Sequence, residues 1–110
     1  MNTDLDLPER VALYFREEEG DGVDGIDECF APDAQVRDEG ELIRGRDAIR
    51  AWKRAAKSRY RYRVEPLAAT RTGDSLQVRA RVAGDFPGSP VELDYAITLE
   101  DGRIASLEIR

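Results

Sequence analysis

The stretch Phe30-Ala-Pro-Asp-Ala-Gln-Val-Arg-Asp38-Glu-Gly40, followed by Gly45-Arg-Asp-Ala-Ile49, decides how this chain folds. Residues 34–38 are predicted to be extended, so alternate side chains face opposite sides of a sheet. Asp38 therefore shares a face with Val36. We expect a carboxylate on that face to point toward the interior, where burial shifts its proton affinity toward general acid or base chemistry.

Apolar residues at helical spacing lie on both sides of this stretch. Leu7-Pro-Glu-Arg-Val-Ala-Leu-Tyr-Phe-Arg-Glu17 predicts a helix whose apolar face ends at Glu18. The spacing predicts a short second helix over 23–30 and a third over 46–57. In the third helix the expected buried stripe is Ala48, Ile49, Trp52 and Ala56, and the expected solvated side is Arg46, Arg50, Lys53, Arg54 and Lys57.

Beyond the third helix the apolar period changes from about 3.6 residues to two. Four segments alternate apolar and charged residues, and turns at 72–74, 87–90 and 101–102 separate them. Helices followed by such a meander predict an α+β fold with helices on one side of a curved antiparallel sheet. The expected inward residues are Tyr60, Tyr62, Val64, Leu76, Val78, Ala80, Val82, Val91, Leu93, Tyr95, Ile97, Leu99, Ala105, Leu107 and Ile109.

Size and composition limit the class of protein. The chain has 110 residues and is expected to form one domain, 1–110. Cys29 is the only cysteine and there is no histidine, so we expect no disulfide, no metal site and no cofactor. No apolar run is long enough to span a bilayer and no signal-peptide pattern occurs. These features favour a cytoplasmic protein without a membrane partner.

Charge is unevenly distributed, although the net charge is only −6. Residues 1–41 carry 3 basic and 14 acidic side chains, residues 42–82 carry 12 and 3, and residues 83–110 carry 2 and 6. The basic block contains Lys57-Ser-Arg-Tyr-Arg-Tyr-Arg63, which interleaves aromatic and cationic residues as single-strand nucleic-acid binders do. Strand alternation separates the two sets onto opposite faces, so we expect no nucleic-acid partner. We interpret the charges as solvated or paired, within the fold or across a dimer; the candidate pairs join Arg61, Arg79 and Arg81 to Glu92, Asp94 and Glu108.

The order and spacing of these segments resemble the nuclear transport factor 2-like superfamily, most closely its SnoaL-like and ketosteroid isomerase-like members. The resemblance covers essentially the whole chain. It implies a cone-shaped curved antiparallel sheet with three N-terminal helices packed on its concave face, a pocket inside the cone, and a homodimer. The fold hosts isomerases, cyclases and proteins without chemistry, so it does not by itself give a function.

The resemblance also implies site residues. Asp38 matches the carboxylate that shuttles a proton beside a carbonyl in ketosteroid isomerases, and Tyr14 matches their oxyanion-donating tyrosine. Tyr95, or Asp94 if the register shifts by one, lies near the place of their second acid, so the isomerase set is incomplete. The alternatives without a catalytic role are an Asp38 that is solvated at the end of its strand and tyrosines that only pack in the core. The expected cavity wall, each member of which could equally be core, is Phe15, Phe30, Trp52, Tyr62, Phe86 and Ile97.

Two functions remain open at this stage. The first is a pocket for a small hydrophobic molecule carrying a carbonyl or hydroxyl, in which Asp38 moves a proton next to the carbonyl and Tyr14 or Tyr95 donates to its oxygen. That would make the protein an enzyme of the isomerase or cyclase type. The second is a non-catalytic ligand-binding or dimeric interaction module. A closed, largely apolar cavity with the Asp38 carboxylate inside favours the first, whereas a filled core or an outward Asp38 favours the second.

Overall fold

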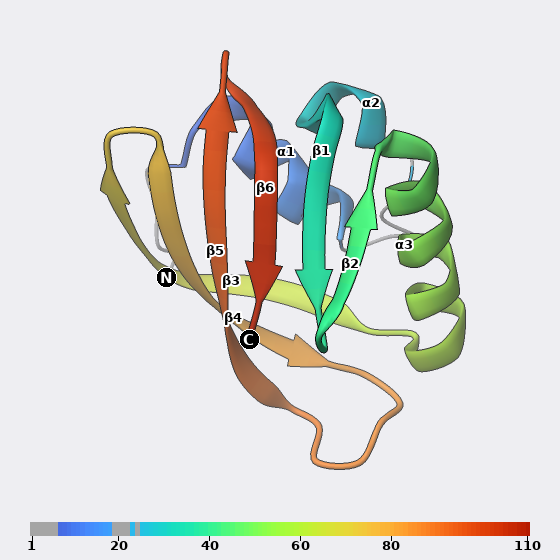
Figure 1. Ribbon diagram of the computed structural model, residues 1–110. Coiled ribbons are helices and arrows are strands. Elements are labelled where there is room, and N and C mark those ends of the chain that lie inside the picture. The colour runs from blue at the N-terminus through green and yellow to red at the C-terminus, as the bar shows by residue number, and fades with distance from the viewer. Residues whose placement is uncertain (1–6, 19–22, 24) are drawn as a thin grey trace.

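A computed structural model describes residues 7–18, 23 and 25–110 and shows an α+β fold, as the sequence predicts (Figure 1). Along the chain, two helices are followed by a two-stranded hairpin, a third helix and then four more strands. The helices are α1 (Glu9–Glu17), α2 (Ile26–Cys29) and α3 (Arg46–Tyr60). The strands are β1 (Phe30–Asp38), β2 (Glu41–Arg44), β3 (Arg63–Thr72), β4 (Ser75–Ala83), β5 (Val91–Glu100) and β6 (Arg103–Ile109).

All six strands belong to one curved, open sheet in the order β2-β1-β6-β5-β4-β3. The predicted meander is confirmed as β3 to β6, in which each strand is antiparallel to the next. The β1–β2 hairpin joins this sheet through β6, and β1 runs parallel to β6. In that register Asp38 lies opposite Ile109. The end of β1 is therefore held by β6 on one side and by β2 on the other.

The structure corrects two boundaries. β1 begins at Phe30 instead of 34, and it accommodates Pro32 because its register with β6 shifts between Phe30 and Gln35. The predicted helix over 23–30 is correspondingly short, and of its residues 24 lies outside the described part of the chain.

The third helix is longer than predicted and ends at Tyr60. Arg61 adopts a left-handed conformation with φ 48°, and its backbone N–H bonds to the Lys57 carbonyl. Tyr60 is consequently a helical residue, and Tyr62 lies in the short connection before β3. Alternation of Tyr and Arg predicted a strand here, but helix packing extends the helix through part of that pattern.

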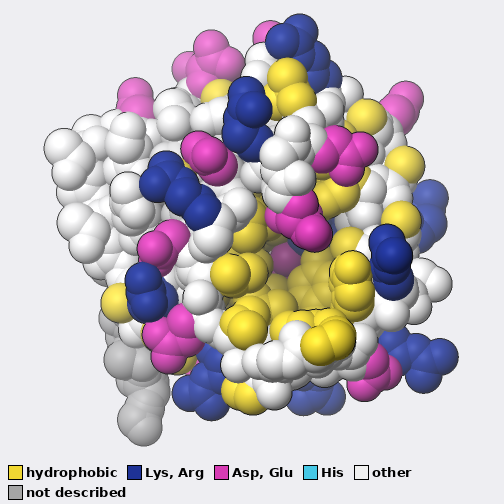
Figure 2. All heavy atoms as spheres, turned by 60° about the horizontal axis from the view of Figure 1, so that its bottom comes forward, with side chains coloured by type: hydrophobic (Ala, Val, Ile, Leu, Met, Phe, Trp, Pro, Cys, Tyr) yellow, Lys and Arg dark blue, Asp and Glu magenta, His cyan; other side chains and the backbone are white. Residues whose placement is uncertain are grey.

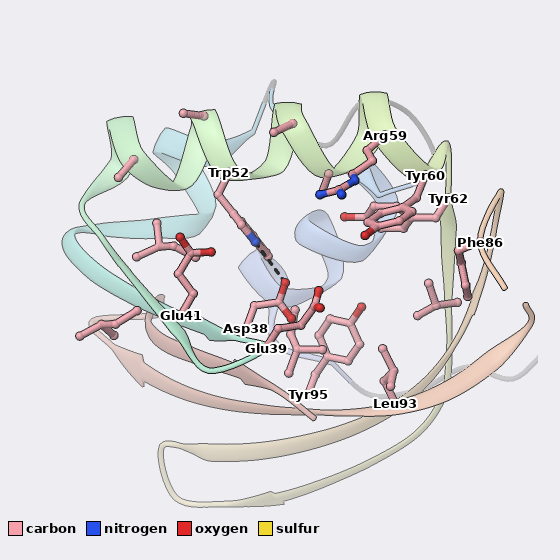
Figure 3. Close-up of a pocket in the computed structure, with 18 of the residues that line it drawn as sticks. Asp38, Glu39, Glu41, Trp52, Arg59, Tyr60, Tyr62, Phe86, Leu93 and Tyr95 are labelled. Carbon is pink, nitrogen blue, oxygen red and sulfur yellow. Dashed lines mark hydrogen bonds between the residues drawn. The ribbon is translucent and has the colours of Figure 1, made fainter. Parts of the chain in front are cut away.

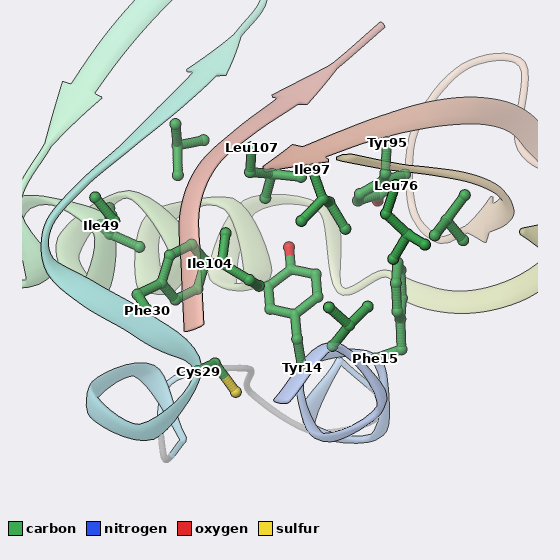
Figure 4. Packing of buried hydrophobic residues seen from close by; sticks show 14 of the residues in the cluster. Tyr14, Phe15, Cys29, Phe30, Ile49, Leu76, Tyr95, Ile97, Ile104 and Leu107 are labelled. Atoms are coloured by element: carbon green, nitrogen blue, oxygen red, sulfur yellow. The ribbon is translucent and has the colours of Figure 1, made fainter. Parts of the chain in front are cut away.

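The core lies between the helices and the concave face of the sheet (Figure 4). Tyr14 and Phe15 of α1 make edge-on ring contacts with each other, with Phe30 and with Tyr95, at centroid distances of 5.2 to 5.7 Å. Ile97 is buried in the same cluster. The predicted alternation of β4 is confirmed, because its buried residues are Leu76, Val78, Ala80 and Val82. Cys29 is also buried, and burial raises the pKa of its thiol to about 11.

Lys53 and Lys57 are buried, although the sequence predicted both on the solvated side of α3. Their relative exposures are 0% and 8%, and Glu18 at the end of α1 is at 0%. They lie four and eight residues after the buried Ile49, on one face of the helix. That prediction was wrong because both cations have partners inside the protein.

Charges on the outer face of the sheet pair across strands, as expected for part of the set. Arg79 contacts Asp94 and Glu92 on β5. Arg81 contacts Glu65 on β3 instead of an acid on β5. These pairs are exposed and are therefore worth little to stability. None of the helices in the described part of the chain is long and apolar enough to cross a membrane.

Candidate functional site

A pocket of about 1070 Å³ opens between α3 and the concave face of the sheet. Figure 2 shows an apolar hollow with acidic and basic side chains around it. α3 contributes one wall, and four of its lining residues are alanines, whose small side chains leave the space free. The β1–β2 hairpin, β5, the loop before β5, the connection between α3 and β3, and single residues of β4 and β6 supply the rest. The lining includes Asp38, Glu39, Glu41, Ile43, Arg44, Ala48, Ala51, Trp52, Ala55, Ala56, Arg59, Tyr60, Tyr62, Phe86, Leu93 and Tyr95.

Asp38 lies in this pocket at the end of β1 and is half-buried. The indole Nε1 of Trp52 donates a hydrogen bond to its Oδ2 over 3.2 Å (Figure 3). Burial raises the pKa of the Asp38 carboxyl above its ordinary value, while the Trp52 hydrogen bond opposes part of that rise. The carboxylate is thus oriented by a neutral donor and is a stronger base than an exposed aspartate.

Two tyrosines bring hydroxyl groups to the same pocket. Tyr95 projects from β5, and Figure 3 shows its hydroxyl on the side where Asp38 lies. Tyr62 enters from the connection between α3 and β3. Burial raises the pKa of both phenols well above the ordinary tyrosine value, so both remain protonated donors at neutral pH.

The structure divides the residues that the sequence singled out into two groups. Pocket-lining positions are held by Asp38, Tyr95, Trp52, Tyr62 and Phe86. The others, Tyr14, Phe15, Phe30 and Ile97, lie in the core and are absent from the pocket lining. Their aromatic and aliphatic groups support the pocket from behind.

Behind the pocket is a buried polar network that sequence reasoning missed. The Lys53 ammonium donates to Glu18 Oε2 over 2.6 Å, to the Tyr14 hydroxyl over 3.0 Å and to the Tyr62 hydroxyl over 3.1 Å. Lys57 donates to the backbone carbonyls of Glu18 and Tyr62. The network therefore connects α1 and α3 to a tyrosine of the pocket.

Burial and pairing act on Lys53 in opposite directions. Burial lowers the pKa of its ammonium, and the neighbouring Glu18 carboxylate raises it. The Lys53 Nζ also lies 4.5 Å from the centroid of the Trp52 ring. The indole N–H of that ring is the hydrogen-bond donor to Asp38. A sequence signal for this network exists: Glu18 continues the apolar stripe of α1, and Lys53 follows Ile49 at helical spacing.

Across residues 7–18, 23 and 25–110, no three side chains of His, Cys, Asp or Glu lie together as a metal site needs. The described pocket lining offers three kinds of polar group beside its apolar wall: the carboxylates of Asp38, Glu39 and Glu41, the guanidinium groups of Arg44 and Arg59, and the phenols of Tyr60, Tyr62 and Tyr95.

The sequence profile of the SnoaL-like domain family matches residues 11–107. The chain therefore belongs to the SnoaL-like family, as the resemblance in its sequence indicated. Comparison with curated proteins gave no match.

Solved structures support the same fold. A Sinorhizobium meliloti protein, provisionally assigned as a polyketide cyclase, is 50% identical over 96% of each chain, with a TM-score of 0.91. A Catenulispora acidiphila protein of ketosteroid isomerase-like fold, solved with trimethylamine, is 23% identical over 94% of this chain and 85% of its own, with a TM-score of 0.81. A SnoaL-like protein from Jannaschia sp. CCS1, also provisionally assigned as a polyketide cyclase, is 20% identical over 99% and 90%, with a TM-score of 0.78. The last two show the fold alone.

Proposed function

We propose that the pocket binds a small hydrophobic molecule carrying a carbonyl or hydroxyl, and that Asp38 moves a proton next to that carbonyl. The observation that carries this proposal is the half-buried Asp38 carboxylate in an apolar-lined pocket, oriented by Trp52. The reaction class is isomerisation or an aldol-type cyclisation. The similarity to the Sinorhizobium meliloti protein, provisionally assigned as a polyketide cyclase, supports the cyclase version.

In this mechanism Asp38 accepts a proton from the carbon next to the carbonyl. The electron pair of the broken C–H bond moves into the carbon–carbon bond and the carbonyl becomes an enolate. Tyr95 donates a hydrogen bond to the enolate oxygen, because its protonated hydroxyl lies in the same pocket. For isomerisation, Asp38 returns the proton to a different carbon of the conjugated enolate. For cyclisation, the enolate carbon attacks a second carbonyl, and Asp38 gives its proton to the alkoxide oxygen that forms. Trp52 holds the carboxylate in place throughout.

Proton exchange in deuterated water tests the role of Asp38 without knowledge of the natural substrate. The probe is 2-tetralone, whose hydrogens next to the carbonyl are followed by proton NMR. We expect the wild-type protein to accelerate their exchange and Asp38→Asn to abolish the acceleration. The matched control is Asp33→Asn, an exposed aspartate on the same strand, which leaves the acceleration intact. Equal exchange with Asp38→Asn and wild type would overturn the proposal.

The non-catalytic module remains the second candidate. It is favoured by the incomplete burial of Asp38, since a carboxylate that water reaches is a weaker base. In that case the wild-type protein would bind ketones without accelerating exchange, and Asp38→Asn would bind them with similar affinity. The same NMR experiment separates the two candidates.

We also propose a cytoplasmic homodimer, which rests on the family resemblance. The outer face of the sheet, where Arg79 and Arg81 lie among acidic residues, is the surface proposed for self-association. Sedimentation equilibrium at high protein concentration tests this. A species of twice the chain mass supports the dimer, and a monomer throughout would contradict it.

A further inference from the structure

The hydrogen bonds of the buried network leave the phenolic proton of Tyr62 without an acceptor among the described residues. An ammonium has three N–H donors and no acceptor. Lys53 uses its three donors on Glu18, Tyr14 and Tyr62, so each of these oxygens accepts from the same cation. The position of the cation is therefore fixed from three directions.

The hydroxyl groups of the two tyrosines in this network differ in whether they donate a hydrogen bond within the protein. The Tyr14 hydroxyl donates to Glu18 Oε2 over 3.0 Å, so its proton is already engaged. The Tyr62 hydroxyl accepts from Lys53, and its proton has no acceptor among the residues that the structure describes. Tyr62 also lines the pocket, whereas Tyr14 does not.

We infer that Tyr62 donates to the ligand oxygen together with Tyr95 and is the stronger of the two donors, because Lys53 polarises it, and that the preferred ligands carry an enolate or phenolate oxygen. A phenol that accepts a hydrogen bond from a cation becomes a stronger donor through its own O–H. The surroundings are buried, which strengthens this polarisation because the local dielectric constant is low. The inference rests on the proposed small-molecule pocket and deepens it.

The surroundings of Tyr62 favour a fixed donor. Lys57 donates to its backbone carbonyl over 2.7 Å, and the Lys57 Nζ lies 4.1 Å from the centroid of its ring. Lys53 holds the hydroxyl at the other end. The Tyr95 hydroxyl, in contrast, has no cationic partner among the described residues. Tyr62 therefore ranks above Tyr95 as a preorganised donor to negative charge.

The test uses 4-nitrophenol, because the absorbance of its phenolate differs from that of the neutral phenol and reports which form is bound. We expect the wild-type protein to bind the phenolate preferentially. Tyr62→Phe removes the donor and should weaken phenolate binding roughly 10- to 100-fold, as expected for a hydrogen bond to a charged group. Binding of neutral nitrobenzene reports the apolar pocket and should stay within about twofold of wild type. The control is Ser58→Ala, which removes an exposed hydroxyl of α3 outside the pocket lining and should retain the phenolate preference.

A second variant tests the contribution of Lys53. Lys53→Met combined with Glu18→Gln removes the closest buried ion pair and keeps the volumes similar. Lys57, whose Nζ lies 3.5 Å from Glu18 Oε1, keeps its two backbone carbonyl acceptors in this variant. We expect it to lose phenolate preference to a similar extent while binding nitrobenzene normally. Unchanged phenolate preference in Tyr62→Phe, or in the double variant, would overturn the inference.

Failure of the inference is distinguishable from failure of the proposed function. Probe binding reports the donor and does not require proton transfer, whereas exchange of 2-tetralone hydrogens reports Asp38. Phenolate bound equally by wild type and Tyr62→Phe, with exchange intact, overturns only the role of Tyr62. Wild-type protein that binds neither probe overturns the inference together with the pocket on which it rests.

Discussion

Lys53 Nζ lies 2.6 Å from Glu18 Oε2, and the two side chains are 1% and 0% exposed. This ion pair joins the middle of α3 to the end of α1 behind the pocket. Removing two charges from water is costly, and the geometry and additional hydrogen bonds determine whether the pair offsets that cost. Glu18 Oε1 also lies 3.5 Å from the Lys57 ammonium, so loss of the carboxylate alone leaves two buried cations and is expected to be more harmful than loss of Glu18 and Lys53 together.

Glu18→Gln alone should lower the free energy of unfolding by about 3–5 kcal/mol, because Lys53 and Lys57 then remain as buried cations without a carboxylate. Adding Lys53→Met should restore part of the loss, because one of the two buried cations is then gone. Urea unfolding followed by circular dichroism measures both. The control is Arg54→Met, an exposed position on α3, with an expected change within about 0.5 kcal/mol. A double variant less stable than Glu18→Gln would contradict this account.

Asp38 should make stability depend on pH in a definite direction. Its pKa is raised in the folded protein above the ordinary value of 3.8 that applies to the unfolded chain. The folded state therefore holds the proton more tightly, and the free energy of unfolding should fall as pH rises from 3.8 through the raised pKa. Asp38→Asn should remove this contribution and be relatively more stable at neutral pH.

Trp52 gives a direct readout of this titration. It is the only tryptophan in the chain, and its indole N–H bonds to Asp38. We expect its fluorescence to change with pH around an inflection above 3.8, and Asp38→Asn to lack that inflection. An identical inflection in both proteins would assign the titration to another group.

Trp52→Phe should raise the pKa of Asp38 further. Burial raises the pKa of the Asp38 carboxyl, and the indole hydrogen bond lowers it by favouring the charged carboxylate. Without the hydrogen bond, the pKa-raising effect of burial is no longer partly cancelled. Carbon NMR of the Asp38 carboxyl measures the pKa, and the pH profile of 2-tetralone exchange should move to higher pH. Tyr60→Phe serves as the pocket control. A pKa that stays constant or falls in Trp52→Phe would show that Trp52 does not bias the carboxylate.

Gly84→Ala should disturb the pocket through the backbone. A Cβ at Gly84 would lie 2.7 Å from the Tyr60 carbonyl oxygen and 2.7 Å from the Tyr62 Cα, which is closer than packed atoms approach. We expect a loss of about 1–3 kcal/mol in the free energy of unfolding, as overpacking usually costs. Phenolate binding should weaken because Tyr62 is displaced. Ala83→Ser, at an exposed neighbouring position, should change neither quantity, and normal binding by Gly84→Ala would show that Tyr62 does not depend on this contact.

The meander was predictable from the sequence where one face of a strand is buried and the other is exposed to solvent. In β4 that contrast is complete, and a two-residue period is then a direct consequence of the pleat. The end of α3 was harder to predict from the sequence. The Tyr and Arg residues after Lys57 alternate as they would in a strand, but the helix continues to Tyr60. Local pattern could not show that packing extends the helix there.

The polar network behind the pocket was not predicted, although its positions fit helical stripes. A lysine is normally solvated, and only a partner on another helix makes its burial favourable. Glu18 and Lys53 are far apart in sequence, so their pairing depends on tertiary structure. Asp38 and Trp52 were each singled out from the sequence, but their hydrogen bond is likewise a tertiary contact.

The parallel pairing of β1 with β6 has a consequence for the order of folding. β1 carries Asp38, and the strand that pairs with its other edge is the last strand of the described fold. Contacts between such distant segments form late, because a long loop must close before they contribute any stability. Asp38 therefore reaches its final position only after β6 has docked. During synthesis on the ribosome, an incomplete chain can contain all the pocket tyrosines and Trp52 and still lack an organised site.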